Sequence, residues 1–370
     1  MAATSPIPAL AAPARAQTAL ARPRYDLLDG LRGLAAIAIV VHHATATSGH
    51  RELFPSAATA VEFFFCVAGF VTAAAHQQKL AEGMRFTQYG RRRLLRLYPM
   101  YAIGTLLGVA AMAMLQAHGL TNLGTAGMAG AFALNALFLP YFNFGYFQQV
   151  LATPIRGAVF PFDPPAWTLF FLLATNLLYA ATARAGRGIA WTIVAAAGAS
   201  LWLAGLAYGE APGWGADNLT GGFPRVLFSF FAGVMIYRLR DRLPLRLPAA
   251  LLVAATLALY EMPHFEGHLY YWLVAAIAIV PLLVAAASNC PVAEGNLFQR
   301  LCRYSGRISY PLYCIHYPLL MLLPLAVPTA TPFPLLLAGF VAACLGLSHF
   351  LARLVEAPVQ ARLSSPRRAP

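Results

Sequence analysis

Long apolar runs recur along this chain, and they constrain its fold more than any other feature. Several extend over roughly 16 to 20 residues, which as helix is enough to cross about 30 Å of hydrocarbon. Of the 370 residues, 59% are hydrophobic and 11% charged, and that charged share is about half the value of an average soluble domain. Backbone groups in lipid must be hydrogen-bonded within the segment itself, so these runs are expected to be helices. The expected fold class is therefore an all-α integral membrane protein.

The distribution of basic residues predicts how many runs cross the membrane. The candidate runs lie at approximately 31–50, 57–76, 98–117, 126–140, 165–183, 188–208, 222–239, 247–262, 269–287, 308–326 and 333–353. If the N-terminus is cytoplasmic and 126–140 does not cross, only Arg51, Arg156 and Arg225 of the 26 Lys and Arg residues fall outside. This is the bias that the positive-inside rule describes. We therefore expect about ten transmembrane helices with both termini cytoplasmic, and a short re-entrant or interfacial segment at 126–140.

Composition also bears on domains and partners. We expect residues 1–24 to form a disordered cytoplasmic tail, 25–356 a single transmembrane domain and 357–370 a short basic cytoplasmic tail. No basic stretch precedes an early apolar run, so a cleaved signal peptide is not expected. The net charge of +13 is dispersed over short loops, which does not indicate a nucleic-acid partner. The five cysteines include no CxxC pair, so neither a disulfide framework nor a metal site is expected.

A histidine deep in the first apolar run is the first candidate for chemistry. The run follows Asp29, includes Arg32 and reaches His42 and His43. Eleven residues of helix rise about 16 Å, which places His43 near the middle of the membrane. An ionisable group is costly there and is often functional, and a neutral imidazole could serve as a general base. A histidine that only packs between helices would fit the same pattern.

Two further groups of charged residues are candidates for binding. Arg93 and Arg96, preceded by Arg92, stand at i and i+3 and could clamp the phosphates of a cytosolic anion. A cluster that binds lipid head groups is the alternative. Glu62 precedes an aromatic run at the outer boundary. Its carboxylate could orient a substrate hydroxyl or a histidine, or it could be a solvated boundary residue.

Taken in order, these segments resemble the membrane-bound acyltransferase family 3. Arg32, ten residues and then His43 match the hallmark of that family, whereas His42 does not. Glu62 to Phe70 is similar to its acidic, Phe-rich segment, and Arg93 to Arg96 fits its Arg-x-x-Arg signature. Further similar segments follow in the expected order, at 165–169, 221–225, 308–318 and 356–358. The resemblance covers roughly residues 25 to 362.

The resemblance implies an enzyme that transfers an acyl group, usually acetyl, from cytosolic acyl-CoA to a hydroxyl of a carbohydrate or lipid-linked glycan. Acyl-CoA would be a co-substrate, with no bound cofactor and no metal, in a bacterial-type inner membrane. Arg93 and Arg96, with Arg92, would hold the CoA phosphates. His43 would face a pocket opening between Arg93 and Arg96, as a general base or as an acyl-histidine relay, and Asp29 and Arg32 would set its orientation and charge.

The resemblance also suggests where an acceptor could bind. The candidates are Glu62, Trp167, Arg225, Tyr310 and His316, although an aromatic residue or histidine at a span boundary is often an interfacial anchor.

Two positions depart from the family pattern. Leu172 replaces a glutamate found in many relatives, and Ala68 replaces a serine. An inactive membrane scaffold of the same family therefore stays open as an alternative. A small-molecule or anion transporter also stays open, because ten spans with a buried histidine and a basic cytoplasmic mouth would suit an anion pathway.

Overall fold

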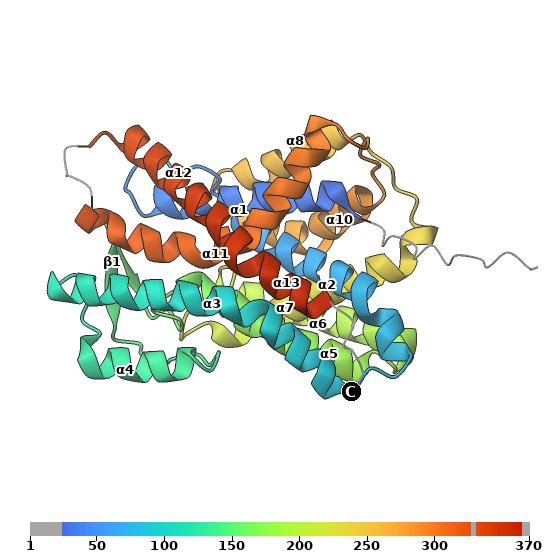
Figure 1. The fold of residues 1–370 in the computed structure, drawn as a ribbon, viewed down its shortest axis with the longest axis horizontal. Helices are drawn as coiled ribbons and strands as arrows, with labels where there is room; N and C mark the ends of the chain where they lie inside the picture. Colours follow the sequence, from blue (N-terminus) through green and yellow to red (C-terminus); the bar gives the residue numbers. More distant parts are fainter. Residues whose placement is uncertain (1–23, 327–330, 365–370) are drawn as a thin grey trace, which may run out of the picture.

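The structure, a computed structural model, describes residues 24–326 and 331–364. These residues form a bundle of helices with one small β-hairpin (Figure 1). Residues 1–23 and 365–370 of the two predicted tails lie outside the described residues. Within the predicted C-terminal tail, Ala357–Ser364 forms the short helix α13.

The helices follow one another along the chain with few interruptions. They are α1 (Asp26–Ala46), α2 (Ala58–Ala81), α3 (Phe86–Ala117), α4 (Gly124–Asn135), α5 (Trp167–Thr182), α6 (Gly186–Tyr208), α7 (Gly222–Leu239), α8 (Ala249–Glu261), α9 (His268–Val274), α10 (Val280–Ser288), α11 (Leu297–Ala326), α12 (Phe333–Leu351) and α13. Short helical turns are η1 (Pro164–Ala166), η2 (Leu219–Gly221), η3 (Arg240–Arg242), η4 (Ala275–Ile279) and η5 (Ala352–Glu356). Strands β1 (Phe147–Val150) and β2 (Thr153–Arg156) pair antiparallel, with Phe147 opposite Arg156.

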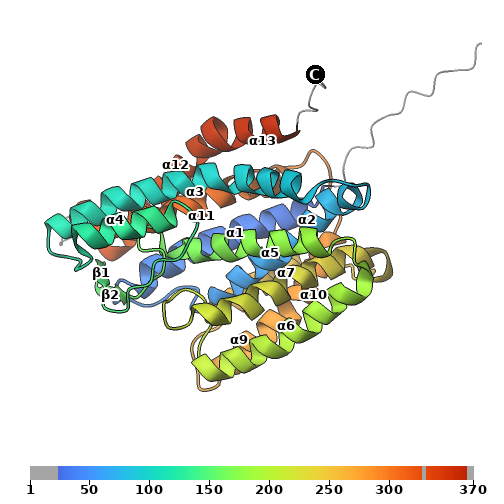
Figure 2. The same cartoon turned by 90° about the horizontal axis from the view of Figure 1, so that it is seen from below.

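The helices confirm the all-α membrane fold. Among the described residues, nine helices are long and apolar enough to span a bilayer, and α8 is a shorter apolar helix of 13 residues. These ten elements coincide with the ten predicted crossings. The remaining run, 126–140, contains α4, whose 12 residues give a length of about 18 Å, close to that of α8, so length alone does not distinguish these two helices. Helix α4 lies alongside α3 near the β-hairpin (Figures 1 and 2), as expected of a re-entrant or interfacial segment.

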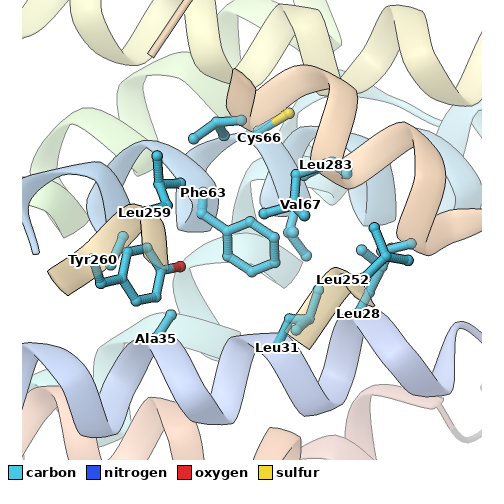
Figure 3. Close-up of a cluster of buried hydrophobic side chains, with 14 of the residues drawn as sticks. Leu28, Leu31, Ala35, Phe63, Cys66, Val67, Leu252, Leu259, Tyr260 and Leu283 are labelled. Atoms are coloured by element: carbon cyan, nitrogen blue, oxygen red, sulfur yellow. The ribbon is translucent and has the colours of Figure 1, made fainter. Parts of the chain in front are cut away.

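The first two helices share a core with α8 and α10. Leu28, Leu31 and Ala35 recur on one face of α1 because residues three and four apart are neighbours on a helix. They pack with the buried Phe63 of α2 (Figure 3), and the same cluster includes Leu252 and Leu259 of α8 and Leu283 of α10. Lipid tails are as apolar as leucine, so close van der Waals packing, rather than removal from water, holds such helices together.

Glycines allow the closest approach between helices α2 and α7. A Cβ built on Gly69 of α2 would overlap the carbonyl oxygen of Phe230, and one on Gly233 of α7 would overlap that of Cys66. Helices α1 and α11 approach in the same way, at Gly33 and Gly306. Small residues at these crossings let the backbones touch and so position the side chains around them.

We expect Gly69→Ala to lower the thermal unfolding midpoint of the protein in detergent. The added methyl must push the backbones of α2 and α7 apart, and overpacking of this kind costs about 1–3 kcal/mol. Gly339→Ala in α12 is the matched control, because a Cβ at Gly339 meets no atom within 4 Å. Equal midpoints for the two variants would contradict the close α2–α7 contact.

Candidate active site

A cavity of about 230 Å³ lies between helices α1, α2, α3, α5 and α11. It is lined by Arg32 of α1, Arg93 and Arg96 of α3, and Tyr310 and Tyr313 of α11, among others. The structure thus brings Arg32 to the same cavity as Arg93 and Arg96, which lie on a different helix. Most of the remaining wall is apolar.

Arg93 is held in this cavity by neutral groups. Its Nε donates to the Tyr89 hydroxyl at 3.1 Å, and one terminal nitrogen donates to the Thr72 hydroxyl at 2.6 Å. The same nitrogen lies 3.4 Å from His76 Nδ1. Tyr89 in turn donates to Asn176 at 2.8 Å, which fixes the phenol that supports the guanidinium. Among the described residues no carboxylate pairs with Arg93, so its positive charge is available to an anionic ligand.

The other two arginines already have carboxylate partners. Arg96 contacts Glu356 at 2.5 Å, and its guanidinium lies over the ring of Tyr310 at 5.5 Å. Arg32 lies 3.3 Å from Asp29 and donates to the carbonyl of Gly306 at 2.6 Å. Arg93 and Arg96 line one cavity, as predicted. Glu356 neutralises the charge of Arg96, whereas no described carboxylate neutralises that of Arg93.

His43 forms a pair with His316. His43 Nδ1 lies 2.9 Å from His316 Nε2, and the two rings are parallel, with centroids 5.2 Å apart. His316 Nδ1 lies 2.8 Å from the carbonyl oxygen of Tyr313. Carbonyls only accept hydrogen bonds, so this nitrogen carries the proton and His316 Nε2 is left with a lone pair. His43 Nδ1–H then donates to that lone pair, and His43 Nε2 is left unprotonated.

The partner of His43 differs from the predicted one. Eleven residues of helix, about 16 Å, separate Arg32 from His43 on α1, and Arg32 bonds instead to Gly306 and to Ser309 of α11. Neither Arg32 nor Asp29 therefore orients the His43 ring. His316, named from the sequence only as an acceptor-site candidate, holds that position.

His43 also does not line the arginine-containing cavity, contrary to the expectation from sequence. The side chains of Phe64 and Tyr313 line the cavity and meet edge to face, with ring centroids 5.8 Å apart. The Tyr313 ring lies 5.8 Å from His316, which contacts His43. One layer of aromatic side chains, Phe64 and Tyr313, thus separates the cavity from the histidine pair.

The adjacent His42 has different surroundings. Its Nδ1 lies 3.1 Å from Glu52 Oε1, and His264 Nε2 lies 3.6 Å from the other Glu52 oxygen. The hydrogen bond from His42 holds the pKa of the Glu52 carboxyl below its usual range. The two neighbouring histidines therefore face different groups, and only His43 meets α11.

Three predicted acceptor residues form a closed buried cluster. Glu62 is 0% and Arg225 2% exposed, and they form an ion pair. Glu62 also accepts from Ser229 at 2.9 Å, and Arg225 donates to the Pro212 carbonyl at 2.8 Å. The guanidinium lies over the ring of Trp167 at 5.0 Å. None of the three lines the cavity, so their contact with an acceptor stays a prediction.

Tyr310 is the remaining acceptor candidate. It lines the cavity beside Arg96, and its hydroxyl donates to the Leu97 carbonyl at 2.6 Å. Leu172 and Ala68, the two positions that depart from the family pattern, also line this cavity. Both substitutions make its wall more apolar.

One buried acid near this region was not singled out from the sequence. Asp163 is 2% exposed, and neither of its carboxylate oxygens has a hydrogen-bond partner among the described residues. Burial raises the pKa of this carboxyl well above its usual range, so the neutral acid is favoured. Its place between Phe162 and Pro164, in an otherwise apolar stretch, was the only sign of burial.

Comparison with known proteins gives two matches. A family model described as an acyltransferase domain matches residues 25–352. "Protein 2 in picA locus" of Rhizobium radiobacter is 34% identical over 166 residues, which are 42% of this chain and 81% of that protein. No solved structure matches the chain significantly.

Proposed function

This chain belongs to the acyltransferase family whose motifs it carries, and from that premise we propose that it transfers an acyl group from acyl-CoA to a carbohydrate hydroxyl. The expected acyl group is acetyl, and the expected acceptor is a glycan or lipid-linked glycan. The chain is an integral membrane acyltransferase. Its proposed location is a bacterial-type inner membrane, with both termini in the cytoplasm.

The observation that carries this proposal is the 2.9 Å contact between His43 Nδ1 and His316 Nε2. An imidazole whose Nδ1–H is engaged by His316 presents an unprotonated Nε2, which is what a general base needs. In the proposed reaction Nε2 removes the proton of the acceptor hydroxyl while the oxygen attacks the thioester carbonyl. The C–S bond then breaks, and the CoA sulfur leaves as a thiolate that takes up the proton. General-base assistance of this kind contributes about 10²- to 10⁴-fold in rate.

A two-step route uses the same nitrogen. His43 Nε2 would attack the thioester itself, CoA would leave as a thiolate, and the imidazole would hold the acyl group. An acceptor hydroxyl would then attack the acyl group and give its proton to the thiolate or to water. Both routes need the lone pair on Nε2, and both need His316 to keep the proton on Nδ1.

The cavity suits the donor. The unpaired charge of Arg93 attracts phosphate, and forked guanidinium contacts are favourable for that group. Apolar wall residues such as Leu172 and Ala68 suit the pantetheine arm. The thioester reaches His43 only if the Phe64 and Tyr313 rings move apart, so donor binding is expected to rearrange that layer.

The direct test is a release assay with purified protein in liposomes. Acetyl-CoA is supplied with a panel of mono- and oligosaccharides, free CoA is measured through its thiol, and sugar esters are measured by mass spectrometry. We expect CoA release that depends on an acceptor and equals the ester formed. Transfer of a solute across the liposome membrane without CoA release would instead indicate a transporter, and no release with any acceptor would favour an inactive scaffold.

A further inference from the structure

A second hollow lies beside the cavity, between the first turns of α3 and the C-terminal helix α13. It has a volume of about 730 Å³, and four arginines line it: Arg85, Arg91, Arg92 and Arg362. We refer to it as the arginine hollow. Leu95 and Leu363 supply its apolar contacts.

The charges of this hollow are uncompensated within the described part of the chain. No side chain of these four arginines makes a hydrogen bond or ion pair with a described residue, and no acidic side chain of the described residues lines the hollow. This differs from Arg32 and Arg96, which have carboxylate partners. Four like charges around one concave surface focus a positive potential there. The start of α3 at Phe86 adds unpaired backbone N–H groups and the positive end of the helix dipole.

Helix α3 connects the hollow to the cavity. Arg92 lines the hollow and Arg93 the cavity, and Leu95 and Arg96 repeat the same alternation one turn later. Successive Cα atoms are about 3.8 Å apart, and successive side chains point about 100° apart around a helix. A single extended ligand that passes over this turn of α3 can therefore occupy both sites.

We propose that the arginine hollow binds the phosphorylated nucleotide end of acyl-CoA, while the cavity takes its pantetheine arm. This inference rests on the proposed function. The nucleotide carries a diphosphate and a 3′-phosphate, which match several guanidiniums better than one. A volume of about 730 Å³ is within the range typical of small-molecule sites. Arg93 alone faces the cavity without a carboxylate partner, so the other phosphate contacts come from the hollow.

The first test is kinetic and uses the full-length protein in neutral detergent. The double variant Arg91→Ala/Arg362→Ala is expected to raise KM for acetyl-CoA at least about tenfold while kcat stays within about twofold, and the effect should shrink at high salt. Arg246→Ala is the matched control, because Arg246 is exposed and does not line the hollow. An unchanged KM in the double variant, with normal turnover, overturns the inference and leaves the proposed function standing.

The second test identifies the ligand. Acetyl-dephospho-CoA lacks the 3′-phosphate. The wild type should have a higher KM for this donor than for acetyl-CoA, whereas the KM of the double variant should rise little further. Additive losses would show that the hollow does not contact the 3′-phosphate and would overturn the proposal. Activity that follows the content of anionic lipid in nanodiscs would instead assign the hollow to a lipid head group and would overturn it as well.

A binding measurement tests the inference without relying on catalytic activity. Adenosine 3′,5′-bisphosphate should bind the wild type and Arg246→Ala in calorimetry and should bind Arg91→Ala/Arg362→Ala at least about tenfold more weakly. Equal binding to all three proteins overturns the inference. Absence of acceptor-dependent CoA release from the wild type would by contrast count against the proposed function alone.

Discussion

His43→Ala is expected to lower kcat for acyl transfer by about 10²- to 10⁴-fold, the range that a positioned general base contributes. The variant removes the nitrogen that would accept the hydroxyl proton in the direct route and that would carry the acyl group in the two-step route. His43 packs against the buried His316 at the α1–α11 contact, so folded yield has to be compared by size-exclusion chromatography. The rate is measured as CoA release per folded protein.

His42→Ala serves as the control, because His42 faces Glu52 instead of His316. It should keep most of the activity. His316→Gln should retain more activity than His316→Ala, since the amide oxygen of glutamine can still accept the His43 Nδ1–H bond. Wild-type rates in a well-folded His43→Ala protein would exclude His43 from the chemistry.

Arg225→Ala is expected to destabilise the protein by about 3–5 kcal/mol, because it leaves the buried Glu62 carboxylate without its partner. The loss includes the stacking of Arg225 on Trp167 and its bond to the Pro212 carbonyl. Thermal unfolding in detergent, followed by tryptophan fluorescence and by aggregation, measures the change.

The double variant Glu62→Leu/Arg225→Met is the informative comparison. Replacing both members of a buried ion pair by apolar residues is often neutral or stabilising, whereas removing one member is costly. The double variant should therefore unfold at a higher temperature than Arg225→Ala. If the single variant is as stable as the wild type, Glu62 has another partner or contacts water.

Sequence reasoning predicted the spans well because its signals are local. Hydrophobic run length and the charge of adjoining loops are properties of short segments, and the ten predicted runs coincide with nine long apolar helices and the shorter α8. The Arg-x-x-Arg spacing likewise placed Arg93 and Arg96 on one cavity, since residues three apart share a helix face.

Partners that are distant in the chain could not be predicted in the same way. His43 and His316 are 273 positions apart, and Arg96 and Glu356 are 260 apart. Such contacts depend on which helices are neighbours and how each is rotated, and local sequence patterns reveal neither. For the same reason the sequence alone does not indicate that Glu62 and Arg225 pair with each other.

The aromatic layer formed by Phe64 and Tyr313 has a consequence for the cell. A cavity that opens into a membrane-spanning bundle risks becoming a leak, and each elementary charge that crosses gains about 2.3 kcal/mol per 100 mV of membrane potential. The edge-to-face contact of these two rings would hinder the passage of protons and small ions whenever no donor is bound. The same rings would keep the thioester of the proposed acyl-CoA donor away from the His43 imidazole until the donor is fully bound. This delay would protect the acyl group from hydrolysis.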